Sequence, residues 1–168
     1  EARHLTHDRD LAYLGFPQWG GMLFMAAMQM GNDRAAAVMH WVFAPLTLML
    51  LPDLLKPIAP RSGWLAAALL LSTTTLVMLA GWAYVEWMLM FAVTASMLAV
   101  VYAGETGESR WLIVAGVMAG LAFGAKYTAV GAIVGLGLAV AVCGRQAGGR
   151  RRAIASAMMF GVAAAITV

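Results

Sequence analysis

The sequence predicts an all-α protein, a polytopic transmembrane helix bundle, and three observations lead to that fold class. Of its 168 residues, 62% are hydrophobic and 11% are charged, whereas soluble domains carry about 25% charged residues. The apolar residues gather in runs close to the roughly 20 residues that a helix needs to cross a bilayer. Polar, proline-rich or arginine-rich segments separate these runs. In such a protein the excess of 11 basic over 8 acidic residues indicates orientation and not a nucleic-acid partner.

Residues 1–34 are predicted to form an extracytoplasmic loop that contains a short interfacial helix. Residues 1–15 are polar, and the Phe-Pro-Gln-Trp-Gly-Gly sequence at 16–21 is typical of a turn. The apolar run Met22–Met30 that follows has too few residues to span a bilayer. We therefore expect it to lie in the membrane interface.

Residues 35–168 are predicted to form the transmembrane helix bundle, with about five full spans and one truncated span. Asn32 or Asp33 can cap the first helix, and Pro45 should kink it. The chain starts without Met and ends inside an apolar run, so we expect the bundle to be incomplete at both ends. The expected spans are residues 35–51, 63–80, 84–103, 111–125, 127–143 and, truncated, 153–168.

The basic residues predict the orientation of the bundle. Loops 52–62, 104–110 and 144–152 fall on one side of the membrane, and the positive-inside rule places that side in the cytoplasm. The N-terminal loop, Glu86 and Lys126 then share the extracytoplasmic face, where their polar groups can converge on one site. The predicted cytoplasmic loops hold seven of the eleven basic residues: Lys56, Arg61, Arg110, Arg145, Arg150, Arg151 and Arg152.

Glu86 and Lys126 are charges placed within long apolar stretches. Glu86 lies one turn inside the third span and must be paired, hydrated or protonated there. It either reaches water from an aromatic belt of Trp82, Tyr84 and Trp87 or lines a polar substrate site. Lys126 either snorkels from the end of a short span or supplies a cation for a phosphate at the membrane surface.

The histidines point to structural roles more than to metal binding. His40 is a lone histidine in the first span, where a buried, hydrogen-bonded side chain is a commoner role than that of a ligand. His4 and His7 lie near Asp8 and Asp10, but their spacing matches no zinc motif. A solvated loop is the favoured interpretation, and no metal site is predicted.

Two sets of glycines recur at four-residue spacing. Gly116, Gly120 and Gly124 form one set, and Gly131 and Gly135 form another. On a helix each set makes a flat stripe, which allows a neighbouring helix to approach closely. Both stripes therefore predict helix–helix packing.

Three short strings occur in order along the chain. They are Phe-Pro-Gln-Trp at 16–19, with the Asp-Arg-Ala-Ala sequence at 33–36 after it, Ala-Gly-Trp-Ala-Tyr-Val-Glu at 80–86, and the 111–128 segment that closes on Lys-Tyr-Thr. Together they resemble the polyprenyl-phosphate-sugar-dependent glycosyltransferases of the GT-C superfamily. The similar branch is the bacterial protein-mannosyltransferase and aminoarabinose-transferase-like group. The resemblance extends over roughly residues 14–143, and the third string is its most specific part.

This resemblance implies an integral protein of the bacterial inner (cytoplasmic) membrane with an extracytoplasmic active site. There a sugar passes from a polyprenyl-phosphate donor to an acceptor, with inversion at the anomeric carbon. Lys126, helped by Tyr127, would neutralise the donor phosphate, Glu86 would line the site, and Gln18 and His40 would complete the substrate-binding set. The implied partners are membrane lipids, the lipid-linked donor and other membrane subunits. Some relatives use a divalent metal and others do not, and nothing in the chain decides between them.

The chain also departs from the family pattern, which leaves an alternative open. The catalytic carboxylate of the family follows an earlier span and would lie upstream of Glu1, whereas Asp8 and Asp10 are weak candidates because they are close to the Pro-Gln turn. Relatives carry an acidic residue near Gly21, where this chain has two glycines. The alternative function is a non-catalytic integral membrane subunit of a larger membrane complex, for which the glycine stripes are equally suitable.

Overall fold

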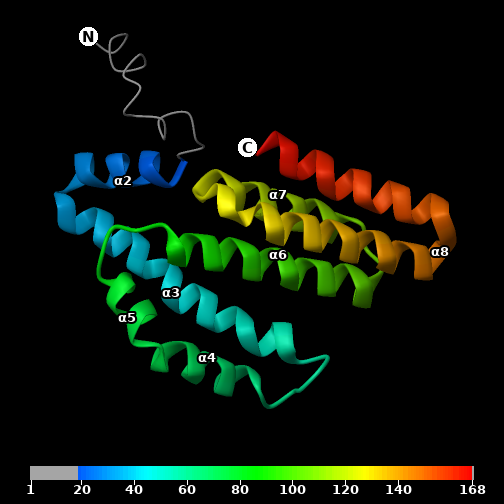
Figure 1. The fold of residues 1–168 in the computed structure, drawn as a ribbon, viewed down its shortest axis with the longest axis horizontal. Coiled ribbons are helices and arrows are strands. Elements are labelled where there is room, and N and C mark those ends of the chain that lie inside the picture. The colour runs from blue at the N-terminus through cyan, green and yellow to red at the C-terminus, as the bar shows by residue number, and fades with distance from the viewer. Residues whose placement is uncertain (1–18, 168) are drawn as a thin grey trace, which may run out of the picture.

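The computed structural model describes residues 19–167, and this part of the chain is all-α, without a strand. The predicted fold class is confirmed. The elements, shown in Figure 1, are α2 (Trp19–Met30), α3 (Asp33–Leu55), α4 (Gly63–Ser72), α5 (Thr74–Ala80), α6 (Glu86–Thr106), α7 (Arg110–Ala125), the 3₁₀ helix η2 (Tyr127–Ala129) and α8 (Val130–Ile166).

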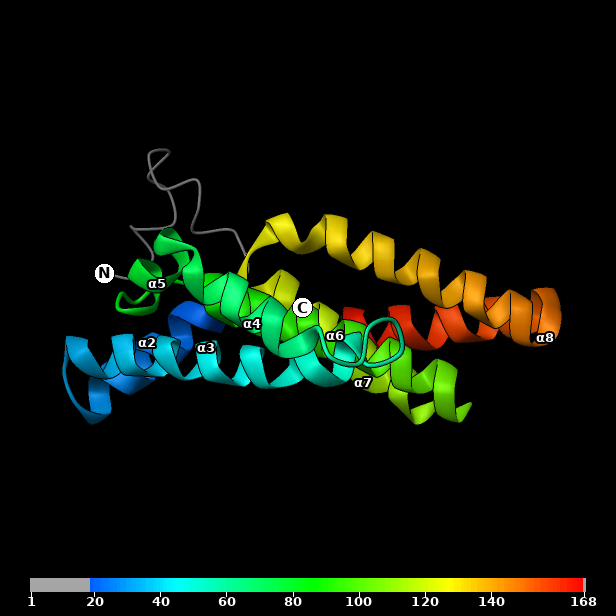
Figure 2. The ribbon, with the colours of Figure 1, turned by 90° about the horizontal axis from the view of Figure 1, so that it is seen from below.

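Helices α6 and α7 form the middle of the bundle, with α3 on one side of them and α8 on the other (Figures 1 and 2). The core between α6, α7 and α8 is built largely from small side chains, among them Ala99, Ala115 and Ala119. Ser96 is buried in α6 and donates a hydrogen bond of 2.7 Å to the carbonyl of Ala115 in α7. Small residues and interhelical hydrogen bonds are the usual means by which helices associate in lipid.

Fewer helices meet the length and composition of a membrane span than the sequence suggested. Within residues 19–167, Arg34–Leu55, Glu86–Thr106 and Tyr127–Ile166 are long and apolar enough to cross a membrane. A fourth crossing is present if α4 and α5, which meet at 80°, form one broken span. The prediction of about five full spans and one truncated span is therefore wrong in its count.

The predicted second span is broken at Thr73, which has an extended backbone (φ −78°, ψ 98°). The hydroxyls of Ser72 and Thr73 both donate to the carbonyl of Leu69, at 2.7 and 3.3 Å. Such local bonds compete with the backbone bonds of a helix. The run of one serine and three threonines at 72–75 thus explains a bend that apolarity alone does not reveal.

The predicted fifth and sixth spans belong to one element, α8, whose two halves meet at a kink at Gly148 and Gly149. Figure 1 shows the second half running back along the bundle. Gly149 has φ +71°, a conformation that a residue with a Cβ rarely adopts. Helix therefore occupies most of the segment 144–152, and the prediction of a loop across that whole segment is wrong.

Of the two caps predicted for α3, Asn32 and Asp33, the structure uses Asn32, and the helix begins at Asp33 and ends beyond the predicted residue 51. Asn32 caps the helix and accepts a hydrogen bond of 3.0 Å from the backbone N–H of Arg34. The helix then continues through Pro45 and Pro52 to Leu55, although a loop was expected from residue 52. Proline is tolerated in bundle helices because neighbouring groups replace the lost backbone bond.

Helix α2 begins at Trp19, so Gly20 and Gly21 are helical and the prediction that they form a turn is wrong. Gly20 instead allows α2 to approach α6, because a Cβ there would lie 3.1 Å from Cγ1 of Val85. An interfacial position for α2 stays a prediction.

The two glycine stripes differ in what they contact. A Cβ on Gly116 would lie 2.7 Å from the Cβ of Ala163, and one on Gly120 would meet the backbone of Ala164. The α7 stripe thus packs against the second half of α8, as predicted. Gly131 and Gly135 have open space around them within the described part of the chain, so their predicted packing is not observed there.

Candidate functional site

The start of α6, the end of α7 and the start of α8 meet at one end of the bundle (Figure 1). We call this the Lys126 end and define it by residues 82–87 and 126–129. The kink of α8 and the loops after α3 and α6 lie at the opposite end, which we call the basic end (Figures 1 and 2). The loops therefore alternate between the two ends in the order that the sequence predicted.

Lys126 and Glu86 form an ion pair, with 3.0 Å between Nζ and Oε1. Forty residues separate them in the sequence, and the side chains keep 38% and 22% of their surface exposed. Oε2 of Glu86 also accepts a hydrogen bond of 3.1 Å from the backbone N–H of Val85. The predicted convergence of the carboxylate and the ammonium is thus present, in a partly shielded position.

The backbone places Lys126 at the break between α7 and η2. Its φ and ψ are −157° and 125°, so the chain is extended for this one residue. Its N–H donates to the carbonyl of Ala122 and its own carbonyl accepts from the N–H of Ala129, both at 3.0 Å. A cation at the end of α7 and a carboxylate in the first turn of α6 each complement the dipole of their helix.

His40 fixes the first turn of α6, in which Glu86 lies. The imidazole is fully buried, and its Nε2 accepts a hydrogen bond of 3.1 Å from the backbone N–H of Trp87. This N–H is one of those that the start of a helix leaves without an intrahelical partner. An accepting Nε2 puts the proton of the neutral ring on Nδ1. His40 is thus a buried, hydrogen-bonded residue, and a direct role in substrate binding stays a prediction.

Trp87 has a different role from the one predicted. Its side chain is fully buried, and its Nε1 donates a hydrogen bond of 3.0 Å to the carbonyl of Leu76 in α5. It therefore ties α5 to α6 and does not belong to an exposed aromatic belt. Trp82 and Tyr84 are exposed, with ring centroids 6.0 Å apart, next to the turn that leads to Glu86.

The start of α2 is anchored beside the same site. Nε1 of Trp19 donates a hydrogen bond to the carbonyl of Leu121, in the last turns of α7. The Trp19 ring lies over Gly124, where a Cβ would collide with it. Close helix packing at Gly124 was predicted, but Trp19 of α2 as the partner was not.

The other predicted site residues divide into two groups. Tyr127 follows Lys126 directly and is 53% exposed. Asp8, Asp10 and Gln18 lie outside the described residues. Within residues 19–167 no cluster of three His, Cys, Asp or Glu side chains could hold a metal ion.

The arrangement at the Lys126 end is suited to binding an anion at a membrane surface. An ammonium group has three N–H donors, and Glu86 accepts one of them. A partly exposed ion pair contributes about 0–1 kcal/mol to stability. Glu86 therefore orients the ammonium but binds it only weakly. A phosphate group can accept the other N–H groups of the ammonium, against the repulsion of the Glu86 carboxylate.

The sequence profile of the family described as dolichyl-phosphate-mannose-protein mannosyltransferase matches residues 16–168. The chain belongs to this family. The match includes every helix of the bundle, together with Glu86 and Lys126, and it makes the chain a membrane glycosyltransferase-like protein. No curated protein and no solved structure matches the chain.

Proposed function

We propose that this chain is part of a glycosyltransferase that moves a sugar from a polyprenyl-phosphate donor to an acceptor on the extracytoplasmic face of the membrane. The observation that carries the proposal is the ion pair between Lys126 and Glu86 at the meeting point of α6, α7 and η2. Family membership favours a transferase over the non-catalytic subunit, since the family is named for transfer from a lipid-linked sugar phosphate.

Lys126 binds the donor phosphate and stabilises it as the leaving group. In the transfer, the acceptor oxygen forms a bond to the anomeric carbon while the bond from that carbon to the phosphate oxygen breaks. The phosphate leaves with one more negative charge, and the acceptor proton passes to a carboxylate base. A fixed ammonium is worth most where charge develops in this way. From the family resemblance, the base is expected upstream of Glu1, and Asp8 and Asp10 are weak candidates.

Glu86 is a positioning residue in this proposal. Its carboxylate is fixed by the N–H of Val85 and by the first turn of α6, so it holds the ammonium at one place. Burial of Trp87 and His40 directly behind it keeps that turn rigid.

The charge distribution supports the extracytoplasmic position of the site. The basic end carries seven basic residues and the acidic residues Asp53, Glu105 and Glu108. Lys126 and Glu86 are the charged residues of the Lys126 end, and their charges balance. Since positive charge is retained on the cytoplasmic side, the Lys126 end faces outward.

The test is sugar transfer by the intact, membrane-inserted protein with Lys126→Met, compared with Lys56→Met. These are the only two lysines of the chain, and Lys56 is exposed at the basic end. We expect Lys126→Met to reduce transfer about 10²- to 10³-fold, as the loss of one fixed transition-state donor does. Lys56→Met should leave transfer unchanged. Both variants should unfold within a few degrees of the wild-type temperature, because a partly exposed ion pair adds at most about 1 kcal/mol.

Glu86→Gln tests the positioning role of Glu86 separately from the phosphate role of Lys126. It removes the partner of the ammonium and keeps the size of the side chain, so we expect the KM for the donor to rise several-fold with little change in kcat. Transfer at the wild-type rate by Lys126→Met would refute the phosphate role and favour the non-catalytic subunit. A loss with Glu86→Gln as large as that with Lys126→Met would refute the positioning role.

A further inference from the structure

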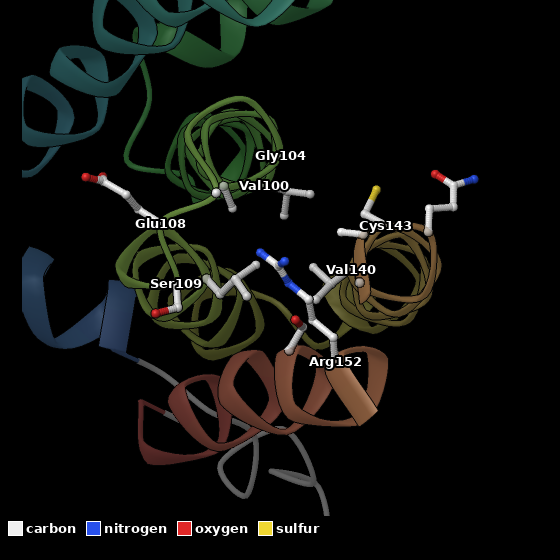
Figure 3. Close-up of a pocket in the computed structure, with 14 residues that line it drawn as sticks. Val100, Gly104, Glu108, Ser109, Val140, Cys143 and Arg152 are labelled. Carbon is white, nitrogen blue, oxygen red and sulfur yellow. The ribbon is translucent and has the colours of Figure 1, made fainter. Parts of the chain in front are cut away.

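A cavity lies at the basic end, far along the bundle from Lys126. It has a volume of about 440 Å³ and is enclosed by the end of α6, the start of α7 and both halves of α8. Figure 3 shows Gly104, Ser109 and Cys143 around it, with the guanidinium of Arg152 directed into the space between the three helices. The function proposed for the Lys126 end does not use this cavity.

Arg152 is the basic residue that lines the cavity, and the fold directs it there. Its Cβ and Cγ lie against Gly148, where an added Cβ would be 2.7 Å from Cδ of the arginine. The stem therefore crosses the kink of α8 at a place where only glycine leaves room. No ion pair is formed by Arg152 within residues 19–167.

The acidic residue that lines the cavity does not neutralise this arginine. The carboxylate of Glu108 is 2.7 Å from the guanidinium of Arg110, outside the cavity lining. Ser109, at the start of α7, makes no side-chain cap for its helix, so that helix start adds partial positive charge on the same side. The cavity is left with an unbalanced positive charge.

Gln146 and Ser156 also line the cavity, and most of the remaining lining is apolar, which distinguishes the cavity from a site for a free anion. Leu112 and Val140 are buried in its wall. On the outer surface beside it, Leu138, Val142 and Ile154 are 50–63% exposed, as expected of side chains that face lipid tails. Arg145 and Arg150 lie among these apolar residues.

We propose that this cavity binds the phosphate of an anionic phospholipid from the leaflet at the basic end, with Arg152 as the direct contact. The guanidinium pairs with the phosphate oxygens, and the apolar wall covers the glycerol and the first carbons of the acyl chains. Basic pockets between membrane helices are suited to acidic headgroups, and arginine pairs with two phosphate oxygens at once. Arg145 and Arg150 attract the same leaflet without entering the cavity.

The test is native mass spectrometry of the intact protein with phosphatidylglycerol as the probe and phosphatidylcholine as the neutral comparison. Arg152→Gln is compared with Arg151→Gln. The second variant also removes one positive charge, but Arg151 does not line the cavity. We expect the affinity for phosphatidylglycerol to fall at least about tenfold with Arg152→Gln, because a charged hydrogen bond is lost. Arg151→Gln should cost less than about fivefold, the contribution of one basic residue near an anionic surface.

Gly148→Ala tests the position of Arg152 independently of its charge, since the added methyl group displaces the arginine stem and every charge is retained. It should weaken phosphatidylglycerol binding without changing the affinity for phosphatidylcholine. Equal losses with Arg151→Gln and Arg152→Gln, or equal retention of both lipids, would overturn the proposal. So would displacement of phosphatidylglycerol by millimolar inorganic phosphate, which would assign the cavity to a soluble anion. All these measurements are independent of sugar transfer.

Discussion

The two ends of the bundle both place a cation where a helix is interrupted, and they treat it in opposite ways. At the Lys126 end the ammonium is 3.0 Å from a carboxylate that a buried histidine and tryptophan hold in position. At the basic end Arg152 follows the kink of α8 and has no acidic partner among residues 19–167. Lys126 is paired with a carboxylate whose position is fixed by its neighbours. Arg152 contributes to the excess of positive charge at the basic end.

This difference separates two uses of charge in a membrane protein. Seven basic residues against three acidic ones at one end determine orientation by their sum, and the geometry of any one of them matters little. A single ammonium at the other end can act on a substrate only if its position is fixed. The hydrogen bonds to Lys126 and Glu86 come from the start of α6, from α7 and from η2. His40 of α3 adds a bond to the neighbouring Trp87.

The largest expected effect concerns the sides on which the two ends lie. Single cysteines are introduced at the exposed positions Ala83 and Ala147, in a Cys143→Ala background that removes the natural thiol. A membrane-impermeant maleimide applied to intact cells should label position 83, and it should label position 147 only after the membrane is permeabilised. The reverse pattern would place the Lys126 end in the cytoplasm. Labelling of both positions on intact cells would show that the two ends do not lie on opposite sides of the membrane.

A smaller effect tests whether the Lys126 end is rigidly constructed. His40→Ala leaves the buried N–H of Trp87 without its acceptor, which should lower the free energy of unfolding by about 1–3 kcal/mol. His40→Gln keeps an acceptor in the side chain and should recover part of that loss. Gln146→Ala, an exposed change at the basic end, should have no effect. The measurement is thermal unfolding of the purified protein, and equal stability of all three variants would show that His40 does not hold the turn.

Sequence reasoning predicted the fold class, a helix cap at Asn32 or Asp33 and the meeting of Glu86 with Lys126, because these follow from apolar runs, local capping chemistry and the alternation of loops. The structure uses Asn32 as the cap. Sequence reasoning failed where a few polar or glycine residues override apolarity. The hydroxyls at Ser72 and Thr73 break a predicted span, and the two glycines at 148 and 149 reverse α8 in fewer residues than expected.

The supporting contacts of the site were the least predictable part. The bond from Trp87 to His40 spans 47 residues, and the one from Trp19 to Leu121 spans 102. Neither leaves a periodic pattern, since each depends on how three helices pack. The burial of Trp87 was also missed, because tryptophans near span ends are usually interfacial.

The central claim is that a positive charge at position 126 binds the donor phosphate, and chemical rescue tests it most directly. In a Cys143→Ala background, Lys126→Cys is alkylated with 2-bromoethylamine, which rebuilds a lysine-like ammonium, or with iodoacetamide, which adds a neutral amide. Mass spectrometry confirms complete alkylation before sugar transfer is measured. The account predicts that Lys126→Cys is inactive, that the ammonium restores transfer and that the amide does not. Equal activity of the two alkylated proteins, whether high or low, would contradict it.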